Sequence, residues 1–182
     1  MADHTSHSLG AFRAEFSSLR SLTERAVVQL DDREFFMTLD GGGNSAAILL
    51  KHVGGNLRSR WTDIFETDGE KPDRWRDREF EREAGDTRES ILARWETGWQ
   101  ALDRTLERLG PADLDREILI RGEKHTVIRA LTRSLAHTAG HVHQAVLLAR
   151  HCRGDQWQTL SIPRGESERF RRDLMDRASH SR

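Results

Sequence analysis

Hydrophobic residues recur three and four positions apart in four separate segments of the chain. This spacing places them on one face of an α-helix, because 3.6 residues complete a helical turn. The third segment shows the clearest pattern, with an apolar stripe of Leu92, Trp95, Trp99, Leu102, Leu106 and Leu109. The other stripes run from Leu9 to Leu30, from Leu49 to Ile64 and from Ile128 to Ala149, and the last helix is expected to continue to about His151. Since no convincing set of strands accompanies them, the pattern predicts an all-α fold, a bundle of four amphipathic helices.

Residues at the ends of these stripes indicate where the helices begin and end. Asn44 or Ser45 is a suitable N-cap for the second helix. Asp86 followed by Glu89 has the spacing of a capping box and predicts the start of the third helix. The Gly-Pro pair at 110–111 ends that helix.

The connections are unusually long for a simple up-and-down bundle. Residues 67–86 are densely charged and predict an ordered connection over the surface, since plain coil of this length is uncommon. Residues 118–127 are compatible with either a small hairpin or an extended entry into the fourth helix. A short charged helix is expected around 166–177. The length of 182 residues favours a single helical domain over residues 1–182, with its core at about 9–170.

Charge and cysteine content exclude several classes of protein. Lys and Arg total 29 against 30 for Asp and Glu, a formal net charge of -1, which argues against a nucleic-acid-binding protein. Cys152 is the single cysteine, so an intrachain disulfide and a cysteine-rich metal site are excluded. No apolar run approaches the ~18 residues of a membrane span, and the first residues do not have the pattern of a signal peptide. We therefore expect a cytoplasmic protein that does not enter the membrane.

Two histidines in the fourth helix have the spacing of metal ligands. His137 and His141 lie four residues apart, so their side chains share a helix face and could share an ion. The residues between them lack the glutamate of the zinc-protease motif, so a third ligand must come from elsewhere. His52, on the shoulder of the second stripe, is the natural candidate, whereas His143 is turned away by about 200°. Three histidines with one open position would form a catalytic type of site for zinc, nickel, copper or iron.

Polar residues near these histidines are candidates for binding a substrate. Asn56 and Gln144 lie on the same faces as the histidines and could position a ligand or a bound water. Arg60 and Arg121 could bind a substrate carboxylate, because guanidinium groups suit bidentate recognition. The alternative for all four residues is a solvated or salt-bridged surface role. Spacing alone identifies no carboxylate that would support the histidines.

Four stretches of the chain together resemble a known superfamily. They are His52 to Pro72, Arg121 to Thr126, Leu135 to Gln144 and Leu160 to Gly165. With a histidine in the second helix and His-x3-His in the fourth, the chain resembles an uncharacterised branch of the DinB-like superfamily of four-helix bundles. The resemblance covers essentially residues 9–170.

The resemblance implies a divalent metal, zinc or nickel, held by His52, His137 and His141 in a bundle that is often a homodimer. Characterised relatives use such a metal to activate a low-molecular-weight thiol such as bacillithiol or mycothiol, or to isomerise maleylpyruvate, and others are labelled metal-dependent hydrolases. It therefore implies thiol S-transferase or hydrolase chemistry on a small molecule, with Asn56, Arg60 and Gln144 as candidate substrate-binding residues. The alternative is a non-catalytic metal-binding or stress-associated dimeric bundle. One departure from the family is His143, at a position where a small residue is common.

Overall fold

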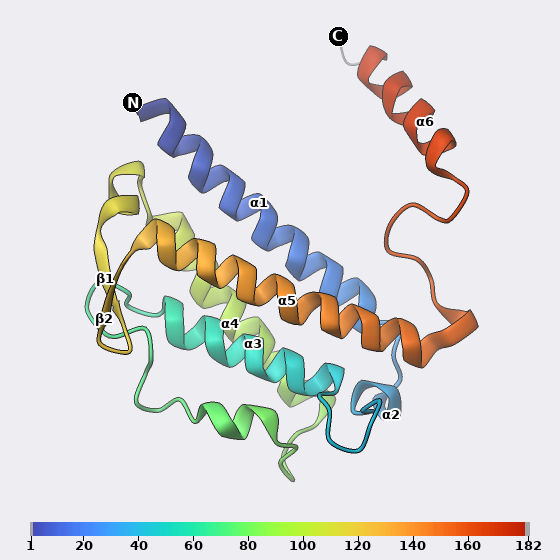
Figure 1. The fold of residues 1–182 in the computed structure, drawn as a ribbon, viewed down its shortest axis with the longest axis horizontal. Helices are drawn as coiled ribbons and strands as arrows, with labels where there is room; N and C mark the ends of the chain where they lie inside the picture. Colours follow the sequence, from blue (N-terminus) through green and yellow to red (C-terminus); the bar gives the residue numbers. More distant parts are fainter. Residues whose placement is uncertain (1, 181–182) are drawn as a thin grey trace.

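The chain is mostly helical (Figure 1). The computed structural model describes residues 2–180, and the side chains of residues 7–177 and 179. The α-helices of this part are α1 (Ala2–Val27), α2 (Asp32–Phe35), α3 (Ala46–Trp61), α4 (Arg88–Arg108), α5 (Val127–Arg153) and α6 (Ser167–His180). Short 3-10 helices are η1 (Arg76–Phe80), η2 (Pro111–Asp115) and η3 (Gly154–Gln156), and strands β1 (Glu117–Ile120) and β2 (Glu123–Thr126) form a two-stranded antiparallel sheet.

The four long amphipathic helices bury most of their predicted stripes in one hydrophobic core, although Ile128 at the start of α5 is exposed. Helix α3 packs along both α4 and α5, and α1 packs along α5 (Figure 1). Trp61, Trp95 and Trp99 are almost fully buried there. Burial of such large apolar side chains is the main favourable contribution to the stability of a helical core. The prediction of four long helices is thus confirmed, although their ends shift by a few residues and the short α2 was not expected.

A β-hairpin precedes α5, which is one of the two alternatives that the sequence left open for residues 118–127. The two strands are joined by Arg121 and Gly122, whose φ angles are +56° and +76°. A two-residue type I′ turn requires positive φ at both central residues, and its twist matches that of the paired strands. The carboxylate of Asp68 accepts hydrogen bonds from the backbone N–H groups of Arg121 (2.8 Å) and Gly122 (2.7 Å). The long connection between α3 and α4 is thereby attached to the hairpin.

The observed start of α3 agrees with the prediction from the sequence, whereas the observed start of α4 differs from it. Ser45 is the N-cap of α3, as one of the two predicted alternatives. The capping box of α4 is formed by Thr87 and Ser90, not by Asp86 with Glu89. Asp86 instead accepts a hydrogen bond from the ammonium group of Lys51 at 2.7 Å. The Lys51 side chain is only 2% exposed, and leaving a buried cation without an anion costs more free energy than changing the residue that caps a helix. Asp86 therefore pairs with Lys51.

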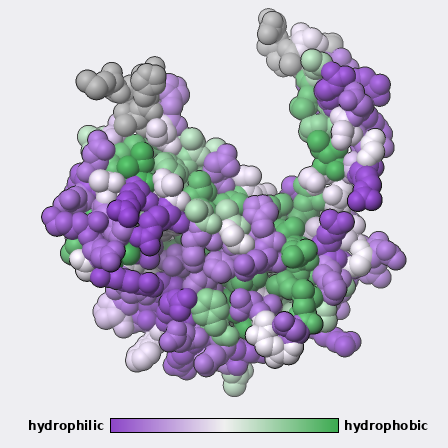
Figure 2. All heavy atoms as spheres, in the orientation of Figure 1, coloured by the Kyte–Doolittle hydropathy of each residue, from purple (hydrophilic) through white to green (hydrophobic). Residues whose placement is uncertain are grey.

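Helix α6 extends away from the rest of the chain (Figure 1). Phe170, Leu174 and Met175 on this helix are exposed, and hydrophobic residues appear along its length in Figure 2. The predicted short charged helix is therefore confirmed, and it carries an apolar stripe as well. Among the helices described, none combines the length and the hydrophobicity that crossing a lipid bilayer demands.

Candidate metal centre

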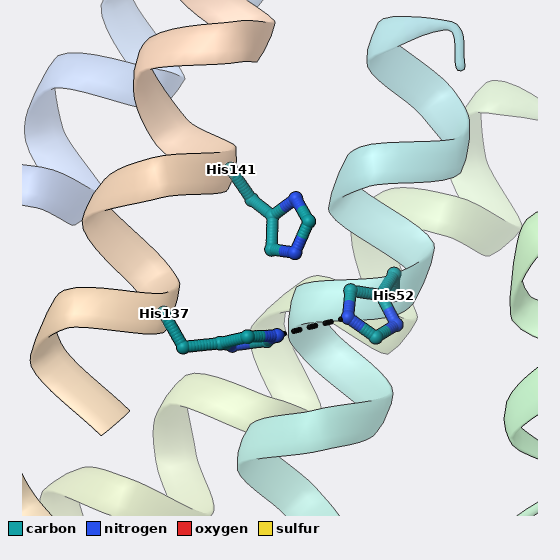
Figure 3. Close-up of side chains that lie close together, drawn as sticks. All are labelled: His52, His137 and His141. Carbon is teal, nitrogen blue, oxygen red and sulfur yellow. Dashed lines mark hydrogen bonds between the residues drawn. The ribbon is translucent and has the colours of Figure 1, made fainter. Parts of the chain in front are cut away.

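Three histidine side chains from two helices converge on one point. His52 comes from α3, and His137 and His141 come from successive turns of α5 (Figure 3). One ring nitrogen from each lies within 4.8 Å of the others. The ring centroids are 4.6 to 5.1 Å apart, and the Nε2 atoms of His52 and His137 are separated by 3.1 Å. The structure therefore brings together the three residues that the sequence predicts as metal ligands.

Helix packing explains this convergence. Helices α3 and α5 lie side by side, and the four-residue spacing places His137 and His141 on the face of α5 that looks toward α3. His52 is buried between these helices, with 2% of its surface exposed. His143 is exposed, and its Nδ1–H donates to the backbone oxygen of Ala139 at 2.7 Å. The helical wheel predicted this outward orientation.

A carboxylate orients His52. The Nδ1 atom of His52 lies 2.8 Å from Oε2 of Glu79, in η1. A carboxylate only accepts hydrogen bonds, so the proton sits on Nδ1 and the Nε2 lone pair is directed toward the other histidines. Metal-binding histidines commonly have such a carboxylate partner, which fixes the ring and raises its basicity as a ligand.

Glu79 is itself held by an arginine and a glycine. Arg74 donates one hydrogen bond to each Glu79 oxygen, both at 2.8 Å. At Gly55 a Cβ atom would lie only 2.2 Å from Oε1 of Glu79, so the absence of a side chain on α3 makes room for the carboxylate. Burial disfavours ionisation of Glu79, but the hydrogen bonds from Arg74 and His52 outweigh it and hold the pKa of Glu79 below its usual value. Glu79 therefore remains an anion beside His52.

The other two histidines are also suited to be neutral ligands. The Nδ1 atom of His141 lies 3.2 Å from Oε1 of Gln144, an acceptor, so its Nε2 can also present a lone pair. Burial, together with the neighbouring His141 and His52, lowers the pKa of His137 to about 3, and burial followed by His52 lowers the pKa of His141. Both rings are therefore neutral near pH 7, the form in which imidazole binds a metal.

The arrangement fits a divalent ion. With Zn–N distances of about 2.0 to 2.1 Å, tetrahedral coordination separates two ligand nitrogens by about 3.3 to 3.4 Å. The observed 3.1 Å between Nε2 of His52 and Nε2 of His137 is close to that value. The two nitrogens are at hydrogen-bond distance, and Nε2 of His137 either donates to Nε2 of His52 or presents its own lone pair, depending on the tautomer of His137. In the second tautomer both nitrogens are available to a cation. The three histidines could therefore hold a metal.

The predicted substrate-binding residues occupy different places around this centre. Asn56, Arg60 and Arg121 line a cavity of about 210 Å³, which His52 and His137 also border. Gln144 is not among the residues that line it, and it contacts His141 instead. The structure thus brings Asn56 and Arg60 to the side of the histidines, and it places Gln144 against the ring of His141.

Glu79 and Arg74 were missed at the sequence level. Glu79 lies 27 residues from His52, inside the connection that the sequence predicts to be ordered and to run over the surface. No helical or strand periodicity relates two residues at that separation across a loop. The available signal was Gly55, three residues after His52, which makes room for another segment on this face of α3.

We expect Glu79→Gln to weaken metal binding by about 10- to 100-fold, the usual effect of removing the carboxylate partner of a histidine ligand. The amide lacks the charge that stabilises the Nδ1–H form of His52. Competition with a chromophoric chelator would measure the affinity. Asp77→Asn is the matched control, because Asp77 lies in the same short helix with a side chain that is 95% exposed. Equal affinities of the two variants would contradict the role of Glu79.

The fold and this centre define a mostly helical protein with a three-histidine group able to hold a metal. The chain belongs to the family described as "Protein of unknown function (DUF1572)", whose family model matches residues 3–166. No curated protein and no solved structure is detectably similar to it.

Proposed function

We propose that this protein is a metal-dependent enzyme that carries out thiol S-transfer or hydrolysis on a small molecule. The observation that carries the proposal is the convergence of His52, His137 and His141 within 4.8 Å, with a carboxylate fixing the ring of the first. The metal would be zinc or nickel, since imidazole nitrogens suit both. A divalent ion held there would act as a Lewis acid that lowers the pKa of a thiol or a water molecule.

The residues of the chain have separate roles in this proposal. Glu79 holds His52 in the tautomer that presents Nε2, and Gln144 does the same for His141. Asn56 and Arg60, which line the cavity of about 210 Å³ that borders His52, would bind and orient the substrate. Orientation of the reactant against the centre is a large part of catalysis in such sites.

The number of protein ligands favours an enzyme over the non-catalytic alternative. Structural zinc sites usually have four protein ligands, whereas catalytic sites have three and leave one position for water or substrate. Both oxygens of Glu79 are engaged by Arg74, and one also by His52, so this carboxylate is not a free fourth ligand. The cavity gives a small molecule access to two of the three histidines, His52 and His137.

The resemblance to the DinB-like superfamily supports the thiol-transfer form of the proposal, with a low-molecular-weight thiol as co-substrate. It also supports a four-helix-bundle core and a homodimer. The exposed apolar residues of α6, Phe170, Leu174 and Met175, are a candidate part of the dimer surface. Sedimentation velocity would measure the oligomeric state.

Elemental analysis tests the central claim. Tag-free protein, produced with zinc or nickel in the medium, is expected to contain about one divalent ion per chain after desalting. Apoprotein prepared with a chelator is expected to recover the same stoichiometry when either ion is added back. A wild-type protein that holds neither ion after purification nor after reconstitution would contradict the proposed function.

A further inference from the structure

We infer that the cavity beside the three histidines binds the anionic group of a small substrate, a carboxylate or similar oxyanion, through Arg60 and Arg133. The inference rests on the proposed function and deepens it, because it names the class of substrate that the same site would take. The two can fail separately, since anion binding is measurable without metal.

The lining of this cavity has an unusual charge composition. Four of its ten lining residues are arginines and none is a carboxylate, although the whole chain has a net charge of -1. The arginines are Arg60, Arg76, Arg121 and Arg133. A concave surface lined with one sign of charge concentrates ligands of the opposite sign. The cavity thus favours anions over neutral or cationic molecules.

Arg60 is the central member of this group because its guanidinium group makes no direct ion pair, although Glu70 acts on it at longer range. In the part of the chain that the structure describes, no carboxylate lies within 4.0 Å of its guanidinium group, and its buried Nη1 atom has no hydrogen-bond partner. Burial lowers the pKa of Arg60 to about 10, and although Glu70 opposes this shift, three neighbouring arginines add to it. A buried donor without a partner is uncommon in folded proteins. An oxyanion in the cavity would supply an acceptor to the part of this guanidinium group that borders the cavity.

Arg133 faces the cavity from α5 and has a neutral partner. It donates to the ring of His125, whose Nε2 lies 3.2 Å from Nη1 of Arg133. His125 is buried, and burial, followed by the charges of Arg133 and Arg129, lowers its pKa, so this ring is neutral near pH 7. The contact positions the guanidinium group without cancelling its charge.

The other two arginines of the cavity already have anionic partners. Arg121 pairs with Glu70 at 3.1 Å, and Arg76 pairs with Asp77 at 3.3 Å and lies over the ring of Phe80. Arg60 and Arg133 are therefore the two cations left for a ligand, and they come from the two helices that carry the histidines.

The shape of these groups and the size of the cavity define the ligand class. A guanidinium group presents a planar pair of donors that matches a carboxylate, which Lys would not. A volume of about 210 Å³ lies below the ~300 Å³ of the smallest usual drug-sized pockets. The ligand is thus a small carboxylate-bearing molecule, with its anionic group at Arg60 and Arg133 and its reacting end toward the histidines.

Calorimetric titration of metal-free protein tests this inference. The probes are malonate, succinate and inorganic phosphate, with malonamide as the neutral counterpart of malonate. We expect at least one anion to bind and malonamide not to bind. Binding of malonate or succinate assigns the site to carboxylates, and binding of phosphate alone assigns it to phosphate-type oxyanions. The absence of binding by all three anions would overturn the inference.

Two variants locate the binding. Arg60→Gln and Arg133→Gln are each expected to weaken anion binding at least about tenfold, since charge-assisted hydrogen bonds are lost. Arg60→Lys, which keeps the charge but not the planar pair of donors, is expected to retain part of the affinity. Arg129→Gln is the matched control, because Arg129 lies on α5 outside the cavity lining. Unchanged affinity in both glutamine variants, with native circular dichroism, would overturn the inference even if the metal stoichiometry is as proposed.

Discussion

Replacement of both His137 and His141 by alanine is expected to abolish stoichiometric metal binding. Only His52 would then remain of the three converging nitrogens. Loss of a carboxylate that merely supports a ligand typically weakens binding about 10- to 100-fold, so loss of two ligands should exceed about 100-fold. Elemental analysis after desalting is expected to give about one ion per chain for the wild type and none for the double variant.

His143→Ala is the control for this experiment. It removes a histidine from the same helix, but one that is exposed and points away from the site. This variant is expected to keep the full metal content. Circular dichroism and the melting temperature of the metal-free proteins would show whether the double variant retains the fold. Equal metal contents in the wild type and a folded double variant would refute the three-histidine site.

Gly98→Ala is expected to lower the free energy of unfolding by about 3 kcal/mol, even though alanine is the better helix former by about 1 kcal/mol. A Cβ at Gly98 would lie 2.3 Å from the backbone oxygen of Gly54 and 2.7 Å from its Cα. These are main-chain atoms of α3, so rotation of a side chain cannot relieve the clash, and α3 and α4 must separate. Urea denaturation followed by tryptophan fluorescence would measure the change.

Gly140→Ala is the matched substitution in α5. A Cβ at Gly140 would meet no atom within 4 Å, so this change should leave stability unchanged or raise it by up to about 1 kcal/mol. A Gly98→Ala protein as stable as the Gly140→Ala protein would show that the contact between α3 and α4 is not as close as described.

The helices could be predicted because hydrophobic periodicity is local and strong. The stripe of α4, for example, runs through Trp95 and Trp99, and both are buried in the common core. The hairpin could not be distinguished from an extended segment, since each strand has only four residues. Its conformation depends on the backbone angles of Arg121 and Gly122 and on a cap from Asp68, which is distant in sequence.

The candidate site was predictable in part for the same reason. A four-residue spacing on one helix identified His137 and His141, and a position on a neighbouring stripe identified His52. The contact of His52 with Glu79 crosses a connection of irregular structure, where no periodicity applies. The prediction that Asp86 caps α4 is wrong because the capping rule considers only neighbouring residues in the sequence. It does not include the buried Lys51 of α3, which pairs with Asp86.

The contact between Gly54 and Gly98 has a consequence for how sequences of this family can vary. Two residues beyond His52, α3 meets α4 through main-chain atoms, and on the adjacent face Gly55 admits Glu79. The distance between α3 and α4 near His52 is therefore set by main-chain atoms. It does not depend on which hydrophobic side chains fill the core. Proteins can exchange core residues for others of similar total volume and still fold. We expect that relatives with quite different core residues keep this histidine at the same distance from α4, as long as the glycines at positions 54 and 98 are both retained.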